Sequence, residues 1–398
     1  MRERLVSLDV FRGLTMAGMV VVNNPGDWGH VYAPLLHADW HGWTPTDMIF
    51  PFFLFIVGVA ITLSSRSASV VSILKRGAII FAVGLFLAGF PTFDLSRWRI
   101  PGVLQRIALC YVATALVYRW FGHLGAASGS RSPEKEPAGA VGTAGVVSAV
   151  AGTTGAAGFI RTALPLAVLA TILMLGYWAI LMLVPVPGGA AGDLRPGMDL
   201  GAYIDRALMD GHLWKPTWDP EGLLSTIPSV ATTLLGTIAG LWLRTTAPGG
   251  RKAGLLAIAG VGAIVVGEVW NLAFPINKNL WTSSYVMFMG GAAALFLALC
   301  YWIIDVKGWR RWTYPLVVLG TNALALYAFS GLLVDTMARI TIEPDGGRAM
   351  SSSRWVYTTA FEPFFSPKNA SLAYALAHLA LLFLVLLWMY RRKIFLRA

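Results

Sequence analysis

The chain carries little charge for its length. Only 13% of its 398 residues are Asp, Glu, Lys or Arg, whereas an ordinary soluble domain has about 25%. Hydrophobic residues make up 56% of the sequence and the mean hydropathy is +0.64, so too few polar groups are present to cover the apolar surface in water. These values exclude a soluble enzyme and a disordered protein, and they indicate an integral membrane protein.

Cysteine is nearly absent as well. The two cysteines, Cys110 and Cys300, each lie inside an apolar run, where a thiol behaves as a small buried hydrophobic group. Two such residues exclude a disulfide scaffold and give no information about the redox compartment.

Ten segments are long and apolar enough, or nearly so, to cross a bilayer, which requires roughly 20 residues of helix. They predict an all-α integral membrane protein with about ten transmembrane helices. The expected spans are 8–24, 48–65, 75–91, 101–121, 162–185, 223–244, 252–274, 281–304, 312–334 and 371–390.

The loops between these segments differ in charge from one side to the other. Most of the 31 Lys and Arg residues fall on one side, whereas carboxylates outnumber basic residues on the other. By the positive-inside rule the basic side and both termini face the cytoplasm. The net charge of +11 therefore reports topology, and no nucleic-acid partner is expected because the basic residues are spread over six loops.

Residues 122–160 consist almost entirely of Gly, Ala, Ser, Thr, Val and Pro. Such a segment buries little surface, so it predicts a flexible cytoplasmic linker. The linker separates residues 1–121, with the first four helices and an outer loop rich in His, Asp and Trp, from six further helices in 161–398. We expect the two parts to form one functional membrane domain.

The outer loop after the first span contains three of the six histidines, His30, His37 and His41. Histidine transfers protons near neutral pH, so the loop is a candidate catalytic site. Two other interpretations are open: the loop anchors the chain at the membrane interface, or His37, Asp39 and His41 bind a metal.

Other polar residues lie at the ends of spans. Arg106 falls about one turn inside the fourth span, where it either pairs or lines a wet cavity, or else extends outward to water. Asp219 precedes Pro220 and is predicted to cap the next helix, which leaves Glu221 to bind an amine or sugar hydroxyls. Asn322, in the middle of the ninth span, is expected to form an interhelical hydrogen bond.

Six sequence blocks, taken together and in this order, resemble the signature blocks of the heparan-alpha-glucosaminide N-acetyltransferase family. The blocks are 7–13, 37–51, 99–106, 219–227, 274–281 and 305–308, and they extend over nearly the whole chain. The resemblance implies an acetyl-CoA-dependent N-acetyltransferase that moves acetyl from cytoplasmic acetyl-CoA, a co-substrate, to the amine of a glucosamine-type sugar on the far side.

The resemblance also assigns catalytic roles. His37 would act as general base, or as a nucleophile that carries the acetyl group. Asn23 would donate a hydrogen bond to the developing oxyanion, and Asp47 would orient the imidazole. No metal is expected, because the family pattern does not require the residue types of Asp39 and His41.

The remaining candidate residues contact the two substrates. Those expected to bind acetyl-CoA are Arg12, Gln105 and Arg106. Those expected to bind the acceptor are Trp40, Glu221, Asn277 and Lys278.

The expected surroundings are a lipid bilayer, specifically the cytoplasmic (inner) membrane of a bacterium, with a homodimer as a further expectation. The main alternative is a multi-pass permease for amino sugars or related small molecules. A third interpretation keeps the acyltransferase but gives it a different amine or hydroxyl acceptor, because fold alone does not determine the substrate.

Overall fold

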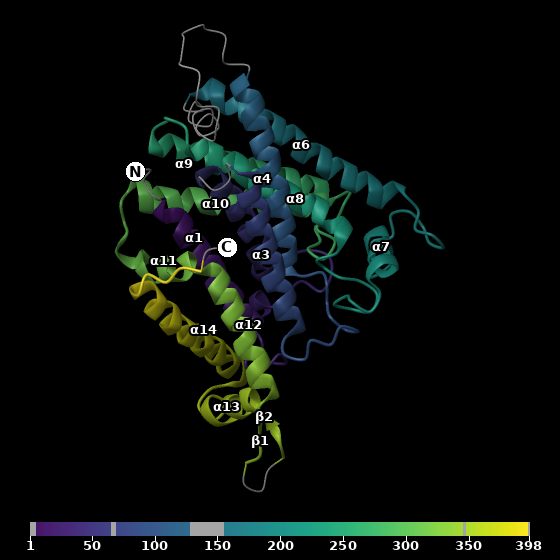
Figure 1. The fold of residues 1–398 in the computed structure, drawn as a ribbon, viewed down its shortest axis with the longest axis vertical. Helices are drawn as coiled ribbons and strands as arrows, with labels where there is room; N and C mark the ends of the chain where they lie inside the picture. Colours follow the sequence, from purple (N-terminus) through teal and green to yellow (C-terminus); the bar gives the residue numbers. More distant parts are fainter. Residues whose placement is uncertain (1–4, 65–68, 128–154, 345–347, 397–398) are drawn as a thin grey trace.

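The computed structural model describes residues 5–64, 69–127, 155–344 and 348–396. Long helices dominate it, as Figure 1 shows. Before residue 128 these are α1 (Val6–Asn23), α2 (Ile49–Leu63), α3 (Val70–Gly89) and α4 (Val103–Ala127). After residue 154 they are α6 (Ala156–Leu183), α7 (Leu200–Met209), α8 (Leu223–Leu243), α9 (Gly249–Asn271), α10 (Ser283–Cys300), α11 (Tyr314–Thr321), α12 (Ala323–Arg339), α13 (Ser352–Ala360) and α14 (Pro367–Arg391).

Shorter elements connect these helices. Two 3-10 turns, η1 (Ala33–Leu35) and η2 (Pro45–Met48), lie in the loop after α1, and η4 (Tyr301–Val306) continues α10 as a π-helical segment. A third 3-10 turn, η5 (Arg311–Thr313), precedes α11. Strands β1 (Thr341–Ile342) and β2 (Met350–Ser351) form a small antiparallel pair between α12 and α13.

The predicted fold class, an all-α multi-pass membrane protein, is confirmed. Eight helices of the described chain are long and apolar enough to cross a membrane, and α11 with α12 makes a ninth span that is bent by 69°. The remaining predicted span, 101–121, corresponds to α4, whose 25 residues extend for about 37 Å at 1.5 Å per residue.

The bend in the ninth span lies at Asn322, which the sequence placed in mid-helix. Its side-chain Nδ2 donates to the backbone oxygen of Ile394 at 3.1 Å, and its Oδ1 accepts from the backbone N–H of Leu396 at 3.1 Å. Asn322 therefore connects the bend to the non-helical segment that follows α14, and not to another helix as the sequence predicted; its side chain satisfies backbone groups of that segment.

Small residues allow the central helices to approach closely. A Cβ at Gly58 of α2 or at Gly236 of α8 would overlap the backbone of the other helix. The same holds where α1 crosses α11, at Gly13 and Gly320. Small residues at helix crossings are typical of membrane bundles, because backbones there pack without intervening side chains.

Helix ends with basic flanks meet at one end of the bundle, called the basic end here. The backbone N–H of Ser7 donates to Asp305 Oδ2 at 3.2 Å, which joins the start of α1 to the end of η4. Arg244 Nη1 donates to the oxygen of Thr62 at 2.9 Å, which joins the ends of α8 and α2. The helix ends that the charge pattern assigned to the cytoplasmic side therefore lie together in the structure.

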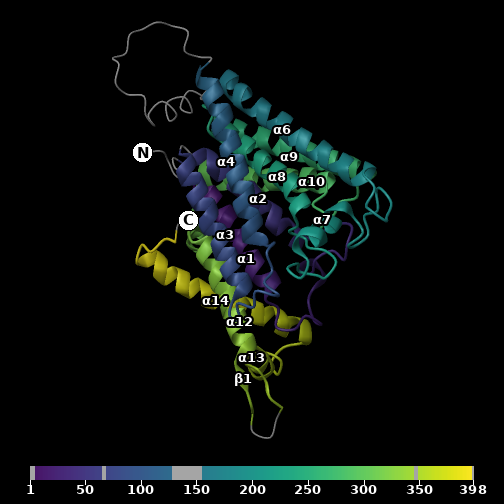
Figure 2. The ribbon, with the colours of Figure 1, turned by 45° about the vertical axis from the view of Figure 1, so that its right-hand side comes forward.

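The loops that precede α2, α4, α8 and α10 gather at the opposite end. The backbone N–H of Gly42 donates to the oxygen of Ile276 at 2.7 Å, and that of Ile100 donates to the oxygen of His212 at 3.0 Å. Helix α7 also lies at this end (Figure 2). Four loops that are distant in sequence thus form one polar surface.

The two predicted parts of the chain pack against each other: α2 lies against α8, and α1 against α11. The predicted linker 122–160 is helical at both margins, because α4 continues to Ala127 and α6 begins at Ala156. Its central part, 128–154, lies outside the described residues.

Candidate active site

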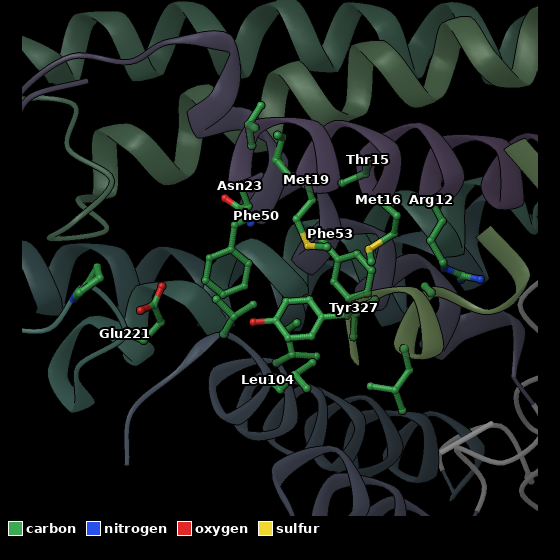
Figure 3. A pocket seen from close by; sticks show the side chains of 18 of the residues that line it. Arg12, Thr15, Met16, Met19, Asn23, Phe50, Phe53, Leu104, Glu221 and Tyr327 are labelled. Atoms are coloured by element: carbon green, nitrogen blue, oxygen red, sulfur yellow. The ribbon is translucent and has the colours of Figure 1, made fainter. Parts of the chain in front are cut away.

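A cavity of about 1030 Å³ extends through the bundle from the basic end to the opposite end. Its wall is formed by α1, α2, α3, α4, the α11–α12 bend and the loops of the opposite end. Figure 3 shows Arg12 at one end of the cavity and Asn23 and Glu221 at the other, with Met16, Met19, Phe53 and Tyr327 between them. The cavity is therefore polar at both ends and apolar in the middle.

His37 lines the opposite end of the cavity and contacts a buried carboxylate. Its Nδ1 lies 2.6 Å from Oδ1 of Asp47, whose side chain is 1% exposed, whereas the imidazole is 47% exposed. A carboxylate accepts from the Nδ1–H tautomer, which leaves the lone pair on Nε2. The imidazole is thus fixed in one orientation with Nε2 as the basic nitrogen.

Asp47 is held by its own local fold. Residues 44–47, Thr-Pro-Thr-Asp, form a capping box with Pro at the first position of η2. Asp47 Oδ2 accepts from the backbone N–H of Thr44 and that of Ala38, both at 3.0 Å, and from Thr44 Oγ1 at 3.2 Å. Both carboxylate oxygens therefore have partners, and the carboxylate cannot rotate away from His37.

Lys278 lies beside the same imidazole. Its Nζ is 2.9 Å from His37 Nδ1, 3.2 Å from His37 Nε2 and 3.5 Å from Asp47 Oδ1. Burial lowers the pKa of the Lys278 ammonium below its usual range, although Asp47 acts in the opposite direction.

Asn23 is the last residue of α1 and lines the cavity. Within the described part of the chain its carboxamide has no hydrogen-bond partner. The adjacent Asn24 is buried, and its Nδ2 donates to the oxygen of Val20 at 2.5 Å and to Ser330 Oγ at 3.2 Å. Of two neighbouring asparagines, one is engaged in structure and the other is available to a ligand.

Asp219 does not cap α8, which corrects the sequence prediction. Helix α8 begins at Leu223 after Gly222, and Asp219 instead binds Arg99 through two hydrogen bonds of 2.9 and 2.7 Å. Burial alone would raise the pKa of Asp219, but the guanidinium holds it below its ordinary value. Arg99 also lies 2.5 Å from Glu221 Oε2, so one arginine joins two carboxylates at the mouth of the cavity.

Aromatic side chains surround this mouth. Trp28, Trp214 and Trp218 line it together with Lys215 and Asp39. The indole rings of Trp214 and Trp218 are in edge contact, with centroids 5.4 Å apart. Indoles beside carboxylates suit a polar ligand with apolar faces and a cationic group.

Two residues predicted to bind acetyl-CoA lie outside the cavity wall. Arg106 is 1% exposed, donates to Gly222 O at 3.1 Å and to Ser225 Oγ, and stacks over Trp281 at 5.2 Å. It does not extend to water, because partners within the protein hold it. Gln105 is also buried, at 4% exposure, and neither residue lines the cavity.

Two residues predicted to bind the acceptor lie one layer behind the cavity. Asn277 is fully buried, and its Oδ1 accepts from the backbone N–H of Leu280 at 2.9 Å. Its Nδ2 lies 3.3 Å from His41 Nδ1. Trp40 donates from Nε1 to the oxygen of Leu194 at 2.7 Å, so both residues support the loops and do not contact the cavity.

No group of three or more His, Cys, Asp and Glu residues suited to a metal ion is found in residues 5–64, 69–127, 155–344 and 348–396. His41 is turned toward Asn277, so it is not grouped with His37 and Asp39.

Several cavity residues were not assigned to the site from sequence. Four residues that line the cavity received no predicted site role: Arg76, Arg99, Tyr111 and Tyr327. Helical position alone does not show which face of a span meets a cavity.

Comparison with known proteins agrees with this architecture. Residues 4–129 match the family model described as heparan-alpha-glucosaminide N-acetyltransferase, catalytic. The heparan-alpha-glucosaminide N-acetyltransferase of Mus musculus is 32% identical over 371 residues, which is 82% of this chain and 53% of that protein. The Homo sapiens protein of the same name is 32% identical over 376 residues, or 81% of this chain and 52% of the relative.

The chain thus spans about half the length of the curated relatives it matches. The matched segment 4–129 contains His37, Asp47, Asn23 and Arg12, whereas Lys278 reaches the same site from the second part of the chain. On the family match and the two relatives, the chain belongs to the heparan-alpha-glucosaminide N-acetyltransferase family.

Proposed function

We propose that the protein is a transmembrane N-acetyltransferase that takes acetyl from cytoplasmic acetyl-CoA and delivers it to an amino sugar on the far side of the membrane. The observation that carries the proposal is one continuous cavity that reaches from Arg12 and Arg76 at the basic end to His37 at the opposite end. The name of the two relatives states the reaction class, and the cavity supplies a path for it.

The dimensions of α1 fit this path. Arg12 and Asn23 are eleven residues apart on one helix, a rise of about 16 Å. An extended pantetheine arm covers a comparable length, so a nucleotide held near Arg12 would present its thioester close to Asn23 and His37. The apolar wall at Met16, Met19 and Phe53 suits the uncharged arm.

His37 and its partners supply the chemistry. In the direct route the neutral acceptor amine attacks the thioester carbonyl while Nε2 takes a proton from its nitrogen; a C–N bond forms, the C–S bond breaks, and the departing CoA thiolate receives that proton. In the two-step route Nε2 itself attacks and the thiolate leaves; the neutral amine then attacks the acetyl group, a C–N bond forms as the bond to Nε2 breaks, and the proton of the amine passes to the released imidazole. In both routes Asp47 holds the ring, and the carboxamide of Asn23 donates to the oxyanion.

The acceptor would bind at the opposite end. Glu221 and Asp39 offer carboxylates to an ammonium group, and Trp28, Trp214 and Trp218 offer faces against which a sugar ring packs. Arg99 holds Glu221 in place, since the two are 2.5 Å apart. The proposal therefore assigns acceptor contacts to Glu221 and leaves Asn277 and Trp40 as supporting residues.

We assign Lys278 to the positioning of the catalytic pair and not to the acceptor. Its Nζ lies within 3.2 Å of both imidazole nitrogens of His37 and 3.5 Å from Asp47 Oδ1. We place the protein in a cytoplasmic membrane with its basic loops inside, following the charge asymmetry.

The proposal is tested with the purified full chain in nanodiscs, labelled acetyl-CoA and glucosamine. N-acetylglucosamine should form with the wild-type protein, and His37→Ala should lower turnover by about 10³-fold or more while CoA still binds. A permease would instead form no acetylated product in nanodiscs, and after reconstitution into sealed vesicles it would accumulate unmodified sugar whether or not His37 is present.

A further inference from the structure

Two polar groups in the cavity wall have no partner within the described residues. These are Nε of Arg76, on α3, and the hydroxyl of Tyr111, on α4, and both atoms are buried. Buried polar atoms in native proteins are nearly always hydrogen-bonded, so two orphans side by side point to a missing ligand.

The two residues form one unit. The guanidinium carbon of Arg76 lies 4.9 Å from the centre of the Tyr111 ring. Helices α3 and α4 approach closely here, because a Cβ at Gly77 would overlap the side chain of Val112. This close packing brings Arg76 onto the face of Tyr111 and holds both against the cavity.

Arg76 also has no carboxylate within ion-pair distance among the described residues, whereas Arg12, across the cavity, lies 3.5 Å from Asp9 Oδ1. A cation within a membrane-spanning helix is costly unless it meets an opposite charge. The unmatched charge therefore favours an anionic ligand.

The depth of the two arginines in the bundle is the same. Arg12 and Arg76 each follow the first residue of their helix by six positions, or about 9 Å from the basic end. A planar guanidinium with several donors is well matched to a phosphate group, and a phenol hydroxyl adds one more donor.

We propose that Arg76 and Tyr111 form a phosphate-binding site in the cavity, and that this site holds a phosphate of the CoA nucleotide so that the pantetheine arm points toward His37. This inference rests on the proposed function and names the residues that bind the donor. Arg12 closes the site from the other wall through its own guanidinium.

The test measures equilibrium binding of CoA, dephospho-CoA and pantetheine to the full chain in nanodiscs of zwitterionic lipid. Arg76→Gln should weaken CoA binding by about 10-fold or more and leave pantetheine binding unchanged, because pantetheine has no phosphate. Tyr111→Phe should weaken CoA binding by about 3-fold or more, and Arg76→Lys should retain part of the affinity. A loss confined to CoA and absent with dephospho-CoA assigns the 3′-phosphate, whereas an equal loss with both assigns the diphosphate.

Lys75→Gln is the matched control. Lys75 is adjacent to Arg76 on α3, is exposed and does not line the cavity, so the same change in charge should leave CoA affinity within about 2-fold. Equal losses for Lys75→Gln and Arg76→Gln would overturn the inference, and so would equal losses of CoA and pantetheine in Arg76→Gln.

The inference and the proposed function fail in different ways. If the wild type binds CoA and Arg76→Gln binds it equally well, the phosphate site is wrong while the acetyltransferase remains. If the wild type binds neither CoA nor pantetheine, the proposed function fails and the phosphate site fails with it. If Arg76→Gln changes CoA affinity only in nanodiscs that contain anionic lipid, the site binds a lipid headgroup, and its assignment to CoA is overturned.

Discussion

Nδ1 of His37 lies 2.6 Å from Oδ1 of Asp47, and the carboxylate is buried whereas the imidazole is half exposed to the cavity. This arrangement fixes the tautomer and leaves Nε2 as the reacting nitrogen. A second His–Asp pair exists in the same loop region, where His30 Nδ1 lies 2.9 Å from Asp27 Oδ2, but neither residue lines the cavity. The two pairs make a matched comparison.

Asp47→Asn should lower kcat for acetyl transfer by about 10³-fold, because an amide in place of the carboxylate no longer selects the Nδ1–H tautomer. CoA affinity should stay within about 2-fold. The control is Asp27→Asn, which removes an equivalent contact from His30 and should leave kcat unchanged. Equal effects of the two substitutions, measured as initial rates, would show that the His37–Asp47 contact has no catalytic role.

Asn23→Ala should lower kcat by about 10²-fold, since it removes the proposed donor to the oxyanion. The thermal midpoint should not change, because the carboxamide makes no hydrogen bond in the described structure. Asn24→Ala should instead lower the thermal midpoint, because it removes the hydrogen bonds to Val20 and Ser330, and it should leave kcat nearly unchanged. A large fall in midpoint for Asn23→Ala would indicate a structural role instead.

Lys278→Met should lower kcat/KM for acetyl transfer by about 10-fold or more. The substitution removes an ammonium that lies 2.9 Å from His37 Nδ1 and 3.5 Å from Asp47 Oδ1, so the buried carboxylate loses a cationic partner. CoA affinity, measured by equilibrium binding, should stay within about 2-fold. An unchanged kcat/KM would show that Lys278 has no role in the site.

Asp205 predicts a pH dependence of stability that does not involve the site. Burial raises its pKa to about 6, although its Oδ1 accepts from the backbone N–H of Leu223 at 2.9 Å. Because the folded pKa exceeds the unfolded value, this contribution to stability is complete below about pH 4 and is lost as the pH rises through about 6.

Asp205→Asn should therefore gain stability relative to wild type between pH 4.5 and 7.5, by up to about 3 kcal/mol. The amide still accepts the bond from Leu223, so the fold is kept. The measurement is the difference in thermal midpoint between the two proteins at each pH. A difference that does not vary with pH would contradict the raised pKa.

The spans were predictable from sequence because a bilayer leaves a 20-residue apolar segment few structures other than a helix. The bend at Asn322 was not predicted. The side chain of Asn322 there bonds to residues more than seventy positions away, Ile394 and Leu396. Local patterns predict helices, but contacts between residues this far apart cannot be read from them.

Parts of the site that depend on local sequence were predictable, and parts that depend on distant partners were not. Residues 44–47 carry a capping-box pattern that can be read locally, and the structure places Asp47 of that box against His37. Asp219 had an equally good local pattern for a helix cap, yet its partner is Arg99, 120 residues away. For Arg106 the depth in the helix was read correctly, but the face that it presents, toward Trp281 and away from the cavity, was not readable.

The central claim, acyl transfer across the membrane through one cavity, is tested most directly in sealed proteoliposomes of known orientation. Labelled acetyl-CoA is supplied only on the side of the basic loops, and glucosamine is trapped on the other side. The account predicts acetylated sugar in the trapped compartment with the wild type, none with His37→Ala, and no acetyl-CoA in that compartment with either. Transport of unmodified sugar at equal rates in both proteins, with no acetylated product, would contradict the account and establish a permease.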